Sequence, residues 1–118
     1  MKATEILHFA EINKTASQRV EELVNSIRAN GWQGAPILVV ESMGRLITGS
    51  HRLAALNALY EDGFDIDDLG DVAEPVDDII NAWCEENDAY IDDIRLDSLS
   101  DVFAGTWVEQ YKDEIEEW

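Results

Sequence analysis

Four consecutive residues, Gly49-Ser50-His51-Arg52, place a glycine, a hydroxyl, an imidazole and a guanidinium where an apolar strand pattern gives way to an Ala/Leu-rich helical pattern. The first N–H groups of a helix have no intrahelical partner, and the helix dipole adds partial positive charge there. Glycine lets a phosphate approach the backbone, and arginine can hold it with two parallel N–H groups. Histidine can donate a hydrogen bond or move a proton near neutral pH. The segment therefore predicts a phosphate-binding turn.

The same segment also has a purely structural interpretation, because short motifs of this kind often carry no function. Ser50 would then cap the helix, His51 would be solvated and Arg52 would form a surface ion pair. The position of the segment between a predicted hairpin and a predicted helix favours the phosphate site.

The elements that must position this turn are predicted from hydrophobic spacing. Residues 5–10 are short and apolar-rich, which indicates an opening strand with His8 in the core. Thr15-x-x-Gln18 fits a capping box at the start of a helix that ends at Asn30-Gly31. Arg19 on this helix is expected to form a surface ion pair. The buried stripe of the helix consists of Val20, Leu23, Val24 and Ile27.

Residues 36–41 form a compact, β-branched run, which predicts a strand buried on both faces. A turn at residues 42–44 and a second strand at residues 45–48 complete a hairpin. Gly44 would supply a positive φ there, and Glu41 would face Arg45 as a cross-strand pair. A helix follows from residue 50 to about residue 61, with Gly63 just past its end. Its predicted apolar face is Leu53, Leu56 and Tyr60.

Beyond residue 62 the chain becomes acidic. Residues 64–74 predict a solvated loop, which departs from an EF-hand calcium loop at Leu69 and Val76. Pro75 suits the first turn of a following helix, and a last helix is expected after a cap at Ser98. Helical spacing predicts core packing for Trp83, Tyr90, Trp107 and Tyr111, whereas Trp118 is the exception and is expected to be exposed or docked on a partner.

These elements predict an α+β protein in the order β-α-β-β-α, followed by two or three helices. The length of 118 residues suits a single domain with one core. We expect residues 1–62 to form that core and residues 63–118 to form an acidic helical extension packed on it.

The core motifs together resemble the N-terminal domain of ParB-type proteins, whose fold is shared by sulfiredoxins and free-serine kinases. In that family a helix, a "PI-V" strand and a glycine-led, arginine-containing turn follow one another in this order. The matching runs here are 18–31, Pro36-Ile37-Leu38-Val39-Val40 and Leu46-Ile47-x-Gly49-x-x-Arg52-x-x-Ala55. The resemblance covers roughly residues 5–60. It implies that Thr48, Gly49, Ser50, His51 and Arg52 hold nucleotide phosphates.

Departures from the family narrow the chemistry that the resemblance implies. Sulfiredoxins carry a reactive cysteine directly before His-Arg, where this chain has Ser50, so sulfinic acid repair is excluded because a serine hydroxyl cannot replace a low-pKa thiol. Chromosome-partitioning ParB proteins usually have two adjacent arginines and a helix-turn-helix domain, and neither is present here. The His51-Arg52 pair is closer to the sulfiredoxin and serine-kinase branches.

By that resemblance, hydrolysis or transfer of phosphate from a nucleoside triphosphate is the expected chemistry, with Mg²⁺ as a cofactor. His51 is one expected catalytic residue. The kinase branch uses an early carboxylate as base, which makes Glu11 the first candidate, although the sequence alone favours a solvated acid at the end of a strand. The base of the nucleotide and the phosphate acceptor stay open.

Charge is distributed very unevenly along the chain. Residues 1–60 contain six Lys or Arg and five acids, whereas residues 61–118 contain two basic and 21 acidic residues, and the total net charge is −18. Direct DNA binding is not expected, because it needs a basic face. Cys84 is the single cysteine, which excludes an internal disulfide. Without an apolar run long enough for a membrane span or a secretory signal, the chain is expected to be cytoplasmic.

Two other classes of function remain alongside the nucleotide-binding enzyme. The first is a non-catalytic interaction protein, in which residues 61–118 bind a basic protein or imitate nucleic acid. The second is a ParB-like nuclease, which the charge balance disfavours.

Overall fold

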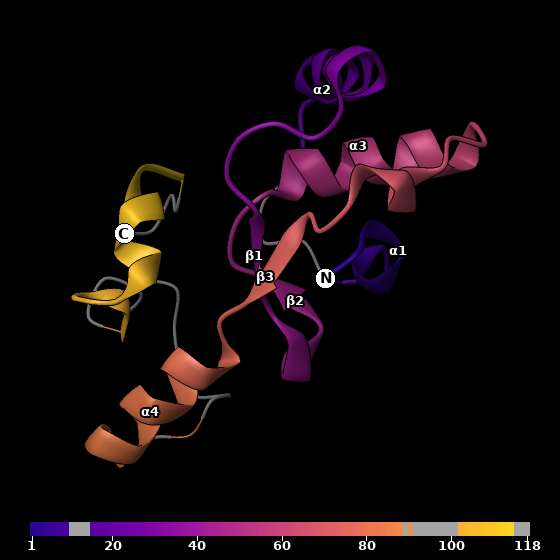
Figure 1. Cartoon of the computed structure of the whole chain (residues 1–118). Helices are drawn as coiled ribbons and strands as arrows, with labels where there is room; N and C mark the ends of the chain where they lie inside the picture. The colour runs from indigo at the N-terminus through magenta and orange to yellow at the C-terminus, as the bar shows by residue number, and fades with distance from the viewer. Residues whose placement is uncertain (10–14, 89, 91–101, 115–118) are drawn as a thin grey trace.

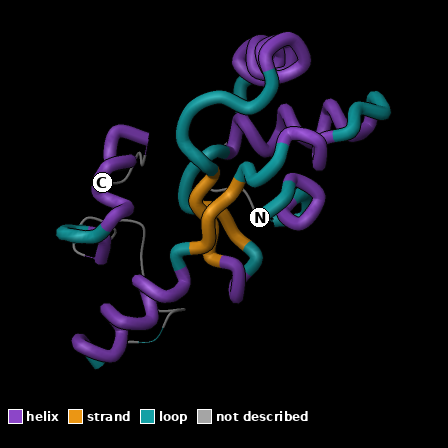
Figure 2. The backbone as a smooth tube through the Cα atoms, viewed as in Figure 1, coloured by secondary structure: helices purple, strands orange, loops and turns teal. Residues whose placement is uncertain are grey.

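A small three-stranded sheet with helices on both sides forms the centre of the protein (Figure 1). The computed structural model describes residues 1–9, 15–88, 90 and 102–114. Within these ranges the α+β class predicted from the sequence is confirmed, and Figure 2 shows the three short strands enclosed by helical segments. The elements are α1 (Ala3–Ile6), α2 (Ser17–Asn30), β1 (Ile37–Val40), η1 (Glu41–Met43), β2 (Arg45–Leu46), α3 (Ser50–Glu61), η2 (Ile66–Leu69), β3 (Ala73–Pro75), α4 (Asp77–Asn87) and η5 (Trp107–Glu114).

The sheet has the order β2-β1-β3, with β1 antiparallel to β2 and parallel to β3. Val39 pairs with Leu46 in one ladder, and Ile37 pairs with Ala73 in the other. All four residues of β1 are buried. Because side chains of a strand alternate between its two faces, β1 supplies apolar side chains to both sides of the sheet. The prediction of a strand buried on both faces is confirmed.

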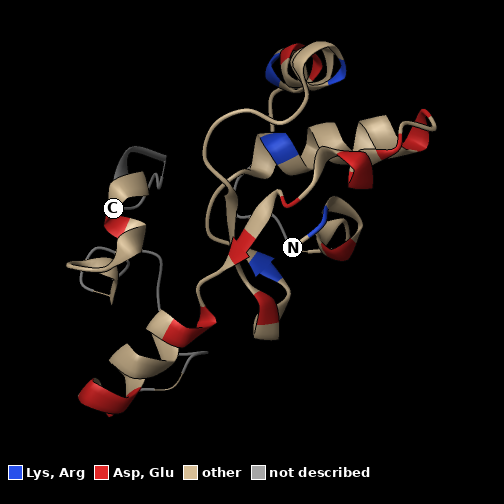
Figure 3. Cartoon of the chain, viewed as in Figure 1, with Lys and Arg blue, Asp and Glu red and all other residues tan. Residues whose placement is uncertain are grey.

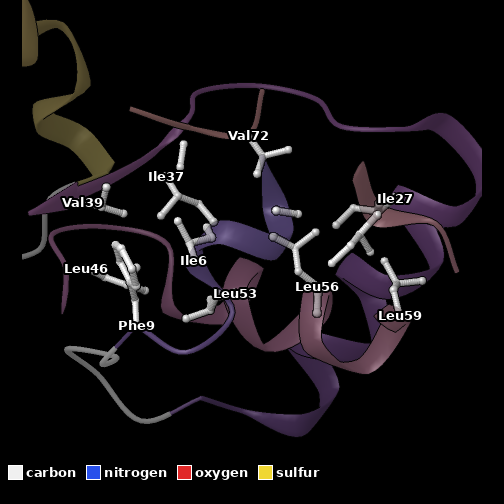
Figure 4. Packing of buried hydrophobic residues seen from close by; sticks show 14 residues of the cluster. Ile6, Phe9, Ile27, Ile37, Val39, Leu46, Leu53, Leu56, Leu59 and Val72 are labelled. Atoms are coloured by element: carbon white, nitrogen blue, oxygen red, sulfur yellow. The ribbon is translucent and has the colours of Figure 1, made fainter. Parts of the chain in front are cut away.

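One face of the sheet is covered by α1 and α3, and α2 packs on α3 (Figure 1). Ile37 and Val39 point into this layer, where they meet Leu53 and Leu56 of α3 (Figure 4). An ion pair of 3.1 Å between Arg28 and Asp62 joins the ends of α2 and α3. The buried cluster also contains Ala3, Ile6, Phe9, Ile27, Leu46, Ala55, Leu59, Ile66, Val72 and Ala73.

The other face is covered by α4 and the segment 102–111. Leu38 and Val40 of β1 and Ile47 pack there against a second buried cluster. The remaining members of that cluster are Val76, Ile80, Cys84, Val102, Phe103 and Val108. The sheet therefore lies between two apolar layers, and residues on both sides of position 62 contribute to the first of them.

The predicted opening strand at residues 5–10 is wrong, because residues 3–6 form α1. Ala3, Ile6 and Phe9 are all buried at a spacing of three residues, which fits a helical face rather than an alternating strand. Thr4 donates from its N–H group and its hydroxyl to the Asp67 carboxylate, which ties α1 to η2. His8 is exposed instead of lying in the core.

The predicted boundaries of α2 and α3 are confirmed at their glycine ends, but two details are wrong. Residue 16 is the N-cap of α2 and no side-chain cap is present, so Thr15 does not form the capping box. Tyr60 of α3 is 56 % exposed, and Leu59 takes its place in the core. Gly44 adopts the expected positive φ of 60° at the hairpin turn.

Strand β3 is absent from the sequence-based prediction, which assigned residues 64–74 to a solvated loop. Ile66, Val72 and Ala73 are buried, and Ala73–Pro75 forms the third strand. Pro75 ends that strand and α4 begins two residues later, so the prediction of Pro75 in the first turn of a helix is wrong. Proline is tolerated in β3 because this strand lies at the edge of the sheet.

In the second half, the predicted helix end near residue 87 is confirmed, with Asp88 adopting a positive φ of 52°. Core packing is confirmed in part for Trp83 and Tyr111, which are half-buried, but not for the exposed Tyr90 and Trp107. The predicted cap at Ser98 and the terminal Trp118 lie outside the described residues. No helix in the described part combines the length and the apolar character needed to cross a membrane.

Candidate functional site

The turn that leads into α3 is built around Gly49, which has φ 87° and ψ 28° and occupies the N-cap position. A Cβ atom at this position would lie 2.8 Å from Cγ1 of Ile37. Both the left-handed backbone and the contact with β1 therefore require glycine for the fold itself. The Gly49 carbonyl accepts the first helical hydrogen bond from the Leu53 N–H at 2.8 Å.

The side chains on either side of Gly49 point into the protein. Thr48 is 4 % exposed and Ser50 is 5 % exposed. Thr48 lies just beyond the end of β2. Its hydroxyl accepts a hydrogen bond of 3.0 Å from the Leu38 N–H of β1. Thr48 thus replaces a backbone acceptor where the hairpin ladder ends, which is a structural role.

His51 is half-buried and links α3 to the start of α2. Its Nε2 atom accepts a hydrogen bond of 3.1 Å from the Ala16 N–H. A nitrogen that accepts a hydrogen bond carries no proton, so the neutral ring carries its proton on Nδ1. In this arrangement Nε2 does not act as a donor to a phosphate.

Arg52 is folded back against the loop of residues 32–35. Its Nη1 group donates to the Ala35 carbonyl, and its guanidinium carbon lies 5.2 Å from the centre of the Trp32 ring. A side chain at Gly34 would approach Nη2 to 3.4 Å, so this loop fits closely around the guanidinium. Stacking on an aromatic face and a backbone hydrogen bond hold the positive charge beside the start of α3.

The electrostatic surroundings of this turn favour an anion. The first turn of α3 contains no acidic residue, although the chain has 26 of them. The positive end of the α3 dipole at this turn adds to the charge of the guanidinium. In Figure 3 the blue of a basic residue lies at the start of α3, whereas the red of acidic residues marks both ends of α4.

Comparison of the chain with protein-family models, curated proteins and solved structures finds no match. The resemblance to ParB and sulfiredoxin domains therefore stays a prediction.

The other polar residues singled out in the sequence lie elsewhere. Glu11 is outside the described residues. Arg19 forms the expected surface ion pair, with Glu22 at 3.7 Å. Among the ion pairs of the described ranges, the predicted pair between Glu41 and Arg45 does not occur. Nor do three His, Cys, Asp or Glu side chains within those ranges gather into a group that could hold a metal ion.

Sequence reasoning missed the contribution of the loop before β1. Trp32 and Ala35 position the guanidinium of Arg52. Ala35 precedes Arg52 by 17 residues in the chain. The available signal was a tryptophan beside a glycine-containing loop that follows a helix, yet it does not specify which cation the ring accepts.

Proposed function

We propose that the first turn of α3 binds the phosphate groups of a nucleotide. The observation that carries the proposal is the Arg52 guanidinium, which the Trp32 ring and the Ala35 carbonyl hold beside a helix start without acidic residues. Helix N-termini are common phosphate sites, and arginine suits the planar arrangement of phosphate oxygens.

The geometry supports binding through the backbone N–H groups and Arg52 more than through the neighbouring side chains. Thr48 and His51 accept backbone hydrogen bonds, and Gly49 meets a requirement of the fold. The resemblance to ParB and sulfiredoxin domains favours a nucleotide over inorganic phosphate. Mg²⁺ enters the proposal only as the counter-ion of a bound triphosphate.

Hydrolysis or transfer of the terminal phosphate is a second step of the proposal, with Glu11 as base. Binding by itself does not require it. Release of phosphate from a triphosphate in the presence of Mg²⁺ would establish turnover, and its loss in Glu11→Gln would assign the base.

Thermal unfolding with ATP, ADP, CTP and GTP, each with and without Mg²⁺, tests the binding step. A ligand at one hundred times its Kd adds about 2.7 kcal/mol to stability. For a domain of this size that corresponds to a rise in Tm of roughly 10 °C. We expect such a rise with at least one nucleotide.

Arg52→Ala should abolish the nucleotide-induced rise, and Arg52→Lys should retain part of it because the charge stays but the planar fork is lost. Arg19→Ala is the matched control, since Arg19 is paired with Glu22 on the surface of α2. Folded Arg52→Ala protein that still responds like the wild type would contradict the proposal, as would the absence of any nucleotide effect.

A further inference from the structure

A groove of about 410 Å³ lies between α4 and the segment 102–106, well separated in the chain from the turn at Gly49. One wall is a single face of α4, and the other wall comes from the segment that packs across the same side of the sheet (Figure 1). The lining residues are Asp78, Ile79, Ala82, Trp83, Glu86, Val102, Ala104 and Thr106.

The floor of the groove is apolar and already anchored to the core. Ile79 and Trp83 are half-buried and pack on the second buried cluster, and Val102 is a fully packed member of that cluster. Ala82 is exposed between them and leaves room where a larger side chain would fill the space. A volume of several hundred cubic ångströms suits one or two apolar side chains of a partner.

Two carboxylates flank this floor. Asp78 and Glu86 are both exposed, and they lie at opposite ends of the α4 face. Eight residues of helix separate them, which corresponds to about 12 Å along the axis. Within the described part of the chain none of the lining residues is basic, and residues 61–118 contain 21 acids against two basic residues.

We propose that this groove binds a basic amphipathic helix of another protein. An apolar side chain of that helix would enter beside Ala82, between Ile79 and Trp83. Two basic side chains, one on each side of the apolar residue and about eight residues apart, would meet Asp78 and Glu86. The spacing i, i+4, i+8 places all three partner residues on one face of a helix.

Charge complementarity selects this occupant over a nucleic acid or a second copy of the chain. Phosphates would be repelled by both carboxylates, and a second copy would bring a further charge of −18. The inference shares no residue with the nucleotide proposal, so the two stand or fall separately.

The probe is a capped, alanine-based helical peptide of about 15 residues with two arginines eight residues apart and a leucine midway between them. Its binding to the full chain is measured by calorimetry at low and high salt. We expect saturable binding that weakens as salt screens the exposed charges. A peptide with glutamates in place of the arginines should not bind.

Two pairs of substitutions with the same change in net charge locate the contact. Asp78→Asn with Glu86→Gln should weaken binding about tenfold, because each exposed ion pair contributes up to about 1 kcal/mol. Glu74→Gln with Glu85→Gln alters exposed acids outside the lining and should change Kd less than about twofold. Ala82→Phe should abolish binding by filling the floor while leaving the charge unchanged.

Equal weakening by both pairs would show attraction to overall charge alone and overturn the groove as the site. Unchanged binding in folded Ala82→Phe would do the same, and so would failure of the arginine peptide to bind the wild-type protein.

Discussion

At the scale of single residues, polar side chains take the place of backbone partners where the short elements end. The Thr48 hydroxyl accepts from Leu38, the His51 ring accepts from Ala16, and the Asp77 carboxylate accepts from Glu41 at 2.8 Å and Ser42 at 2.9 Å. The Leu38 N–H is buried and would be costly without its acceptor, whereas the contacts at Ala16, Glu41 and Ser42 lie at exposed positions and contribute less. Polar residues that suggest binding or catalysis in the sequence therefore have a structural role as acceptors of backbone hydrogen bonds.

Asp77→Asn tests this role. Partial burial of the Asp77 carboxyl raises its pKa, but hydrogen bonds from the Ser42 N–H and side chain and from the Glu41 N–H outweigh it, so the pKa lies below the ordinary value of an aspartate. We expect Asp77→Asn to lower the free energy of unfolding by about 1–2 kcal/mol at neutral pH. The measurement is urea denaturation, with exposed Asp78→Asn as the control.

The lowered pKa of Asp77 also predicts how its contribution to the free energy of unfolding changes with pH. A folded-state pKa below the unfolded one means that ionised Asp77 stabilises the protein above the unfolded value. That contribution is lost as the pH falls through the lower, folded-state pKa. The stability gap between wild type and Asp77→Asn should therefore shrink in acid, and a constant gap would refute the assignment.

At the scale of elements, the passage from β2 to α3 depends on one backbone conformation. Gly49 turns the chain so that Thr48 reaches β1 and α3 packs Leu53 and Leu56 on the sheet (Figure 4). The same turn places the Arg52 side chain against the loop after α2. The fold and the candidate site therefore depend on the same turn between β2 and α3.

Gly49→Ala should destabilise the protein more than Gly44→Ala does. Both residues have a positive φ, which costs a non-glycine residue about 1–2 kcal/mol. A Cβ at Gly44 meets nothing within 4 Å, whereas one at Gly49 would press on Ile37. Overpacking adds about 1–3 kcal/mol. Chemical denaturation of both variants measures the difference, and equal losses would show that the contact with Ile37 is relieved.

At the scale of the whole molecule, β1 connects two apolar layers that lie on opposite faces of one sheet. Ile37 and Val39 belong to one layer, while Leu38 and Val40 belong to the other. The near-neutral half of the chain builds most of the first layer, and α4 and the segment 102–111 of the acidic half cover the second face (Figure 3). We infer that the acidic half is part of the folding unit.

Phe103→Ala tests that inference, because Phe103 is fully buried against the second face, remote in the chain from β1. Loss of a buried phenylalanine costs about 3–5 kcal/mol. We expect that loss within a single cooperative transition followed by both circular dichroism and fluorescence. Trp107→Ala, at a position 43 % exposed, is the control with a small effect. Two separate transitions, or little loss in Phe103→Ala, would contradict the inference.

Local patterns in the sequence were sufficient for several elements. The stripe from Val20 to Ile27 and its terminal glycine predicted α2, and the run at β1 predicted a strand buried on both faces. Gly44 and Gly49 predicted the hairpin turn and the start of α3. Each of these signals depends on neighbours within a few residues, which is why they could be read without a structure.

Other features depended on partners far along the chain. Strand β3 reads as an acidic, proline-containing loop and becomes a strand because β1 offers it a parallel partner. The position of Arg52 depends on Trp32 and Ala35, and that of His51 depends on Ala16. The sequence by itself determined the helical faces, the central strand and the uneven charge, since these follow from local spacing and composition. Only the tertiary structure decided the third strand, the partners of the polar side chains and the acidic groove, because each requires contacts between residues distant in the sequence.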